Sequence, residues 1–377
     1  MSVAVELLSQ LVAIDSVNPD LVPGGAGEGE IARFAAAWLE RAGLEVSLQD
    51  AAPGRPNVIA VARGTGGGRS LMLNAHTDVV GVAGMRRPFE PRVENGRLYG
   101  RGAFDMKGSL AAMMVAGAEA ARRRLRGDVI LTAVVDEEYA SIGTDAVAAS
   151  LRADAAIVTE PTGLGVCVAH KGFVWLEVET AGRAAHGSRP DLGLDAIAKM
   201  GRVLVGLEAL DGWYRSKPSH ALLGSGSLHA SLIEGGQELS SYPERCLVQV
   251  ERRTVPGETP VLVESQLRSM IEGIASEDPG LRVAVRTTFS RPPFEVDEDE
   301  PIVEAVRRHA AAALGREPEV VGHSAWMDSA ILAAAGIPTV VFGPGGEGAH
   351  AAVEWVDLES VERCAEVYLA VAADLCG

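Results

Sequence analysis

Short apolar runs rich in β-branched residues alternate with segments of helical periodicity, and this alternation restricts the fold more than any other feature of the chain. The apolar runs occupy residues 57–62, 70–73, 128–135 and 155–158. Between the second and third runs, residues 107–124 carry apolar side chains at helical spacing. Strands that alternate with helices form a mostly parallel sheet with helices packed on its faces. We therefore predict an α/β fold.

The end of the chain returns to this pattern, whereas the middle follows a different order. Near the C-terminus, the periodicity predicts helices at 301–314, 325–335 and 357–375 and a strand at 338–342. From about residue 168 to 288, the predicted order is strand, helix, strand, strand, helix, strand, typical of a small antiparallel sheet covered by two helices. We predict one domain made of residues 1–168 and 289–377. A ferredoxin-like α+β domain of residues 169–288 is inserted into it.

Composition and charge exclude several classes of function. The 377 residues include 34 Lys and Arg against 51 Asp and Glu, a net charge of −17, and no basic stripe interleaved with aromatic residues occurs. A nucleic-acid partner is therefore not expected. No apolar run has membrane-spanning length, and residues 1–19 lack the features of a signal peptide. The four cysteines contain no C-x-x-C pair. We expect a cytoplasmic protein without a membrane partner.

Histidines and acidic residues follow four of the predicted strands. They are His76 and Asp78 after residues 70–73, Asp136, Glu137 and Glu138 after 128–135, Glu160 after 155–158, and His350 after 338–342. Asp105 lies in a glycine-rich loop just before the predicted helix at 107–124. Each residue alone has an ordinary explanation, such as a capped turn, a helix start or a surface imidazole. Because ligands of open α/β sheets bind at the carboxyl ends of strands, their joint placement predicts one site.

The residue types at this predicted site are those of a metal centre. Imidazole and carboxylate ligands bind zinc and related divalent metals, and shared carboxylates are typical of sites with two ions about 3.5–4 Å apart. Asp78 lies two positions after His76, so its carboxylate is placed to accept the second ring N–H of that histidine. Such a bond fixes the tautomer of the ring and raises its basicity as a ligand.

The ordered motifs resemble those of the dinuclear-zinc amidohydrolases that include acetylornithine deacetylase, succinyl-diaminopimelate desuccinylase, aminoacylase and carboxypeptidase G. The resemblance covers the whole chain, including the inserted domain. The matching segments are 76–78, 100–108, 136–138, 159–162 and 349–350. The resemblance implies that Asp105 bridges two divalent metal ions, with Zn²⁺ expected and Co²⁺ as the alternative. One ion is expected to bind His76 and Glu160, and the other Glu138 and His350.

The resemblance also implies roles for residues beside the ligands. Glu137 is expected to act as the general base for a metal-activated water and to pass the proton to the leaving amine, with Asp78 as a further catalytic residue. The inserted domain is expected to form a homodimer and to carry His186 to the partner subunit's site as an oxyanion donor. A packed or solvated histidine is the alternative. Arg253 resembles a clamp for the substrate carboxylate, and a surface salt bridge is its alternative.

Two positions depart from the family pattern. Ser240 stands where the family commonly has Asn, which puts a substrate or oxyanion contact by that Asn in doubt. Val353 stands where a polar residue commonly precedes the glutamate, here Glu354. Asp328 resembles a family position near the site, with its role left open.

The implied function is metal-dependent hydrolysis of an amide bond next to a free carboxylate. We expect an enzyme that deacylates N-acyl amino acids, in the manner of acetylornithine deacetylase or succinyl-diaminopimelate desuccinylase. A dipeptidase or carboxypeptidase acting on short peptides is the first alternative. A non-catalytic metal- or peptide-binding protein is an alternative of a different class. The G-x-G-x-x-G pattern at 343–348 does not predict a dinucleotide site, because no helix follows it directly.

Overall fold

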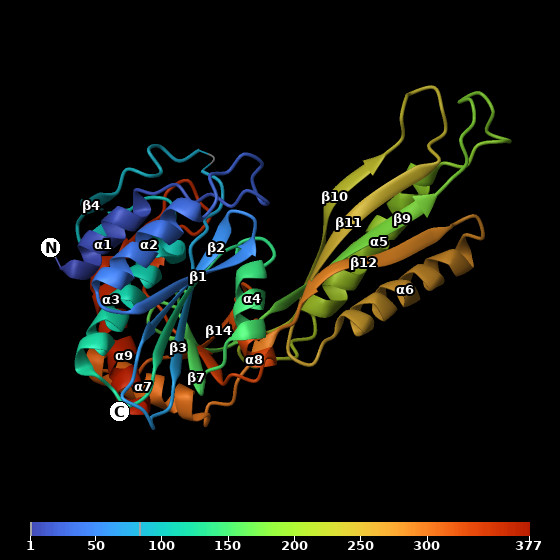
Figure 1. Cartoon of the computed structure of the whole chain (residues 1–377). Coiled ribbons are helices and arrows are strands. Elements are labelled where there is room, and N and C mark those ends of the chain that lie inside the picture. The colour runs from blue at the N-terminus through green and yellow to red at the C-terminus, as the bar shows by residue number, and fades with distance from the viewer. Residues whose placement is uncertain (1, 83) are drawn as a thin grey trace. The chain divides into compact units, whose positions relative to one another are not determined.

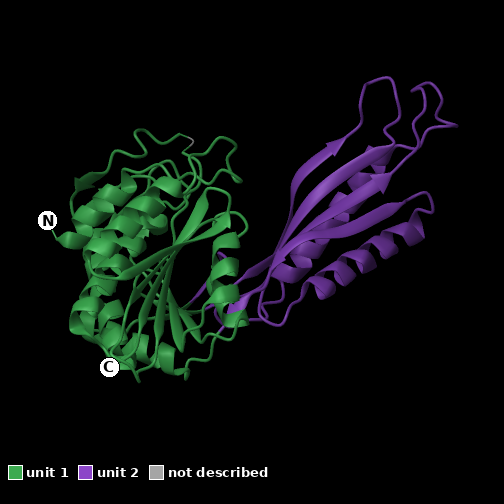
Figure 2. Cartoon of the chain, viewed as in Figure 1, with its two compact units in different colours: residues 1–168, 296–321, 327–377 green, residues 169–295, 322–326 purple. Residues whose placement is uncertain are grey.

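The computed structural model describes residues 2–82 and 84–377 and divides into two compact units (Figure 2). The first unit comprises residues 1–168, 296–321 and 327–377, and the second comprises residues 169–295 and 322–326. The second unit therefore includes residues 289–295 and 322–326, which the sequence-based boundaries place in the first domain. The chain enters the second unit, returns, and contributes to it again with a short segment.

Most strands of a nine-stranded sheet belong to the first unit (Figure 1). The strands of this sheet are β1 (Glu45–Ala52), β2 (Arg55–Ala62), β3 (Leu71–His76), β6 (Val129–Val134), β7 (Ala155–Val158), β8 (Val166–His170), β13 (Phe294–Glu295), β14 (Val320–His323) and β15 (Thr339–Val341). Their order is β1-β2-β6-β3-β7-β15-β8-β13, and β14 pairs with β8. The last two residues of β8 belong to the second unit, where they pair with β13.

The centre of this sheet is parallel. β6, β3, β7 and β15 run in the same direction, while β1, β2, β8 and β13 pair antiparallel at the edges. Every residue of β3, β6 and β7 is buried, as expected for strands covered on both faces. The prediction of an α/β fold with a mostly parallel sheet is therefore confirmed.

Helices cover this sheet. They are α1 (Val3–Val12), α2 (Gly29–Arg41), α3 (Gly108–Arg123), α4 (Ile142–Ser150), α7 (Pro301–Leu314), α8 (Ser329–Ala334) and α9 (Leu358–Leu375), and a short kinked turn, η1 (Ala103–Lys107), precedes α3. A Cβ on Gly117 of α3 would lie 2.5 Å from Leu131 Cδ2 in β6, so the glycine permits the close packing of this helix. No helix within the described residues is long and apolar enough to cross a membrane.

A second, small sheet of the first unit joins distant segments. It contains β4 (Arg92–Glu94), β5 (Arg97–Tyr99), β16 (Gly346–Glu347) and β17 (Trp355–Asp357), in the order β16-β17-β5-β4. Val356 pairs with Leu98 in the antiparallel register of β17 and β5. The loop between β16 and β17 is thereby held beside the glycine-rich loop that follows β5.

The second unit has the strand and helix order predicted for the middle of the chain. Its elements are β9 (Gly172–Ala181), α5 (Ala196–Arg215), β10 (Ser227–Gly235), β11 (Arg245–Thr254), α6 (Pro260–Glu277) and β12 (Val283–Arg291). The four strands form an antiparallel sheet in the order β10-β11-β9-β12. Buried side chains of its strands and helices, such as Val178, Met200, Val248 and Leu267, form a separate core. This topology is the split β-α-β arrangement.

Candidate metal centre

Neighbouring parallel strands bring the predicted ligands to one edge of the large sheet. β6, β3 and β7 lie side by side. His76 is the last residue of β3, residues 136–138 follow β6, and Glu160 follows β7. The carboxyl ends of parallel strands meet at the same edge, so these side chains converge. Asp105 joins them from η1, and His350 joins them from the loop between β16 and β17.

Asp105 lies between the two imidazoles. Its Oδ1 is 3.2 Å from His76 Nε2, and its Oδ2 is 3.5 Å from His350 Nε2. Glu160 Oε1 lies 3.5 Å from the same nitrogen of His76, and Glu138 Oε2 lies 3.0 Å from His350 Nε2. The aspartate therefore offers one oxygen to each of two groups, and each group adds one histidine and one glutamate.

Glu137 lies at the edge of the same cluster. Its Oε2 is 4.0 Å from His76 Nε2. The donor atoms of His76, Glu137 and Glu160 lie within 4.8 Å of one another, and so do those of His76, Asp105 and Glu138. Glu137 is therefore close enough to exchange a proton with a molecule held at this cluster.

The charge balance of the cluster fits two divalent cations. Burial and the charge of Asp105 raise the pKa of Glu138 to about 7. Burial and the charge of Glu160 raise the pKa of Glu137 well above its ordinary value. The buried Oε1 of Glu138 has no hydrogen-bond partner among the residues described. Cations would offset the repulsion between these acids and supply a partner for that oxygen, so the donor set fits a dinuclear centre.

Carboxylates dominate the environment of the imidazoles. Burial acts to lower the pKa of His76, but neighbouring acids, with Glu160 first, outweigh it and raise this pKa well above 6.5. Hydrogen bonds with Asp105 and Glu138 raise the pKa of His350 to about 10. Burial acts to raise the pKa of Asp105, but its bonds to the two imidazoles hold it below its usual range. The surrounding carboxylates therefore shift the pKa of both imidazoles in the same direction.

The backbone of Asp78 orients His76. The Nδ1 atom of His76 lies 2.9 Å from the carbonyl oxygen of Asp78 and 3.5 Å from its Oδ1. The carbonyl is therefore nearer than the carboxylate that we expected to be the acceptor, although both turn Nε2 toward the cluster. The carboxylate instead accepts the backbone N–H groups of Glu137 and Glu138, each at 3.2 Å. It thus holds the loop that carries both glutamates.

A buried polar network, absent from the sequence-based predictions, supports this loop. Asn18 Nδ2 donates to Asp78 Oδ2 at 2.7 Å and to Asp136 Oδ1 at 3.0 Å. Arg55 Nη2 donates to Asp136 Oδ1 at 2.9 Å, and Arg55 Nε donates to Glu28 Oε2 at 2.9 Å. No local pattern marks Asn18 or Arg55, because Asp78 and Asp136 lie 60 and 81 residues from them along the chain.

A second buried carboxylate, that of Glu354, organises the loop of Asp105. It accepts the backbone N–H groups of Gly102, Phe104 and Asp105 at 3.0, 3.0 and 3.1 Å. It also accepts a 2.7 Å bond from Arg101 Nη1, and both side chains of this ion pair are buried. Glu354, noted in the sequence only as a retained motif residue, therefore positions the backbone of the aspartate.

Asp328 is buried close to the cluster. Thr144 Oγ1 donates to its Oδ2 at 2.6 Å, while its Oδ1 has no hydrogen-bond partner within the described part of the chain. Burial raises the pKa of Asp328 to about 6. Its charge also contributes to the raised pKa values of Glu137 and Glu160, after burial and nearer charges. Asp328 therefore adds to the negative charge that surrounds the predicted ligands.

His186 and Arg253 belong to the second unit and are described within it. His186 is exposed, and its Nδ1 lies 2.8 Å from Ser188 Oγ and 3.1 Å from the backbone nitrogen of Ser188. Arg253 Nε donates to Glu251 Oε1 at 2.7 Å, and its guanidinium lies over the ring of Phe173 at 5.4 Å. The arginine thus has the salt bridge that was its alternative interpretation.

Comparison with known sequences agrees with the motif pattern. The sequence model of Peptidase family M20/M25/M40 matches residues 72–374. An acetylornithine deacetylase of Myxococcus xanthus is 33% identical over 383 residues, which cover 98% of this chain and 97% of that protein. An N-formyl-4-amino-5-aminomethyl-2-methylpyrimidine deformylase of Halalkalibacterium halodurans is 28% identical, with 98% of this chain and 95% of that protein covered.

Solved structures share the fold over nearly the full length. A metallo-carboxypeptidase of the M20 family from Sulfolobus solfataricus has a TM-score of 0.81 at 19% identity and covers 99% of both chains. A dinuclear metal-binding peptidase of the M20 family from Bacillus subtilis has a TM-score of 0.76 at 18% identity, covering 99% of this chain and 97% of that one. At these identities the likeness is one of fold.

Proposed function

Because the chain belongs to peptidase family M20/M25/M40, and is thus a hydrolase, we propose that it removes the acyl group from N-acyl amino acids in a metal-dependent reaction. One observation carries this proposal: Asp105 offers one carboxylate oxygen to each of two histidines, with Glu137 beside them. The relative named acetylornithine deacetylase, 33% identical over nearly the whole chain, supports this substrate class. Because the family consists of hydrolases, we do not propose a non-catalytic metal- or peptide-binding function.

The predicted ligands would hold two ions, Zn²⁺ with Co²⁺ as the alternative. Asp105 would contribute to both, His76 and Glu160 to one, and Glu138 and His350 to the other. Two such cations polarise the scissile carbonyl and lower the pKa of the attacking water towards neutrality. The carboxylates hold the ions, while the carbonyl of Asp78 keeps Nε2 of His76 turned to the centre.

Glu137 is the residue that moves the proton. Its backbone is fixed by the Asp78 carboxylate, and its own Oε2 lies next to the ligand cluster. We infer that this oxygen takes a proton from the attacking water and delivers it to the leaving nitrogen. The raised pKa of the buried Glu137 makes its carboxylate a stronger base than an exposed glutamate. Bound cations would moderate this shift.

The inserted segment, residues 169–288, is proposed as a lid and dimerisation domain, with residues 1–168 and 289–377 as the metal-binding catalytic domain. The chain is proposed to form a homodimer. His186 would donate a ring N–H to the oxyanion in the partner subunit's site, which fits the exposure of its side chain. Arg253 would bind the substrate carboxylate, for which it must leave Glu251. No disulfide joins any of the four cysteines, all of which lie within the described residues, and this fits the proposed cytoplasmic location.

An amine-release panel tests the substrate class. Protein loaded with zinc or cobalt is assayed with N-formyl, N-acetyl and N-succinyl amino acids and with dipeptides. We expect kcat/KM to be higher for an N-acyl amino acid than for any dipeptide. The opposite order would establish the alternative, a dipeptidase or carboxypeptidase, which the peptidases of the same fold support.

A variant of Glu137 tests the mechanism separately. Glu137→Gln keeps the shape of the side chain but removes the base, so we expect two bound ions per chain by elemental analysis and a fall in kcat of about 10²–10⁴-fold. Turnover at the wild-type rate would exclude this residue as the base. Mixed dimers of Glu137→Gln and His186→Ala chains should recover activity if His186 acts across the dimer.

A further inference from the structure

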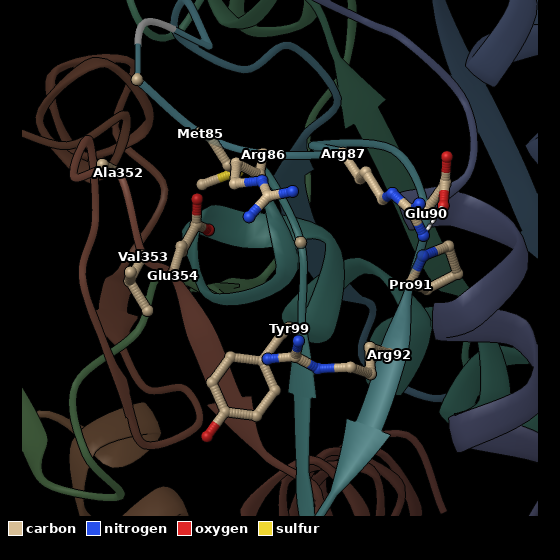
Figure 3. A pocket seen from close by; sticks show the side chains of 12 residues that line it. Met85, Arg86, Arg87, Glu90, Pro91, Arg92, Tyr99, Ala352, Val353 and Glu354 are labelled. Atoms are coloured by element: carbon tan, nitrogen blue, oxygen red, sulfur yellow. Dashed lines mark ion pairs between the residues drawn. The ribbon is translucent and has the colours of Figure 1, made fainter.

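A cavity of about 700 Å³ lies in the first unit beside the metal centre, within the size range of small-ligand sites. Segments 84–87, 90–92, 99–100 and 352–354 form its walls, and we call it the arginine pocket (Figure 3). The segment 352–354 begins two residues after His350. Its Glu354 accepts the backbone N–H of Asp105 at 3.1 Å. One lining residue of the pocket, Glu354, is therefore hydrogen-bonded to the backbone of a predicted metal ligand.

The side chains of the pocket leave an excess of positive charge. Arg86, Arg87 and Arg92 line it. Arg87 lies 3.3 Å from Glu90, which also lines the pocket, and the Glu354 carboxylate is already engaged by Arg101 and three backbone N–H groups. No ion pair in the described part of the chain includes Arg86. All three arginines are exposed to solvent, in a chain with a net charge of −17.

The arginines are combined with apolar and aromatic walls. The guanidinium of Arg92 lies 4.8 Å from the centre of the Tyr99 ring, a cation–π contact that orients it, and 3.5 Å from Glu94. Met85 and Val353 add apolar surface, and in Figure 3 the side chain of Met85 lies next to that of Arg86. Such walls suit a short hydrocarbon chain that ends in an anionic group.

The predicted metal ligands are carboxylates and imidazoles, with no guanidinium group among them. Guanidinium groups bind carboxylates with two parallel hydrogen bonds, and a positive surface beside a negative one steers a ligand to a fixed orientation. The pocket thus provides guanidinium donors for a carboxylate, which the predicted metal ligands do not include.

We propose that the arginine pocket binds the carboxylate of a small organic acid. Two sources share this chemistry: the distal end of a dicarboxylic acyl group on the substrate, and a separate dicarboxylate. Binding of the acyl group of a substrate rests on the proposed function, whereas binding of a separate dicarboxylate does not.

Calorimetric titration with succinate tests the pocket without turnover. The metal-loaded protein is compared with Arg86→Ser/Arg92→Ser, and with Arg316→Ser, an exposed arginine outside the pocket, as the matched control. We expect saturable binding to wild type and control, and affinity at least about 10-fold lower in the double variant. Arg86→Lys/Arg92→Lys should give an intermediate value, because charge remains without the bidentate geometry. Absent binding, or equal binding by all variants, would overturn the proposal.

Kinetics distinguishes the two sources. If the acid is part of the substrate, the double variant raises KM for N-succinyl amino acids about 10-fold and leaves KM for N-acetyl amino acids unchanged. If succinate binding is lost while both KM values stay the same, the pocket serves a separate dicarboxylate. A protein inactive on both substrates contradicts the proposed function, whereas the titration still decides the pocket.

Discussion

Arg55→Met should destabilise the metal-free protein by about 3–5 kcal/mol, the cost of removing one partner from a buried ion pair. The Arg55 side chain is 8% exposed, and its partners Glu28 and Asp136 are 0% and 1% exposed. The same guanidinium also contacts Asp20. Methionine fills much of the volume but leaves two buried carboxylates without a positive charge. The loss should therefore come from uncompensated charge more than from a cavity.

Arg63→Met is the matched control on the surface. Arg63 also bridges two carboxylates, Glu45 and Asp128, each at 2.7 Å, but its side chain is 56% exposed. Solvent screens such pairs, so the expected loss is about 0–1 kcal/mol. Arg55 has three carboxylate partners and Arg63 has two, but the third partner of Arg55, Asp20, is 55% exposed, so the two variants differ chiefly in the burial of the ion pairs that they remove.

Urea unfolding followed by circular dichroism, in EDTA at pH 7, measures the loss of unfolding free energy in both variants from the midpoint and slope of the transition. Burial already raises the pKa of Glu28, and the loss of Arg55 should raise it further. Protonation is then favoured in the folded state, so the deficit of Arg55→Met should shrink between pH 7 and pH 5. Adding Glu28→Gln should recover part of the loss. Equal losses in Arg55→Met and Arg63→Met would refute the reasoning from burial.

Three further outcomes are expected. Asp105→Asn should bind fewer than two ions per chain by elemental analysis, since one side chain is proposed to serve both; two retained ions would contradict a bridge. In metal-free protein, His350 should contribute to the free energy of unfolding, because its pKa is raised to about 10 in the folded chain. This contribution should be fully present below the unfolded pKa of about 6.5 and should be lost as pH rises through about 10. Urea unfolding of wild type and His350→Ala from pH 6 to 10.5 measures this contribution. A difference in the free energy of unfolding that does not change with pH would contradict the prediction. Gly117→Val should cost about 1–3 kcal/mol by overpacking Leu131, while Gly212→Ala, with open space around it, should stabilise α5 by about 0.5–1 kcal/mol by the same measurement.

The periodicity of the chain was sufficient to predict its parallel core. The apolar runs at 70–73, 128–135 and 155–158 became β3, β6 and β7, all fully buried. Buried parallel strands leave continuous apolar runs, which is why they can be recognised. Short or weakly apolar elements were missed: α2, α4 and the small sheet of β4, β5, β16 and β17 have no comparable run. The predicted helix at 325–335 is shorter, with α8 beginning at Ser329.

The residues proposed as ligands were also found from the chain alone, because each lies at a strand end or in a glycine-rich loop. Whether they share a site depends on strand order. The order β6-β3-β7 places three of these ends side by side, and no local pattern specifies that order. The carbonyl of Asp78 as the nearer acceptor for His76 likewise follows from backbone geometry that sequence does not display.

The sequence by itself determined the α/β class and the residue types of the proposed dinuclear site. Both follow from local features: the period of apolar residues and the chemistry of side chains next to them. Only the tertiary structure decided how the site is held. Arg101 and Glu354 lie 253 residues apart, and Asn18 and Asp78 lie 60 apart. A buried polar group must form hydrogen bonds with the groups that the fold places next to it, so these pairings depend on tertiary packing.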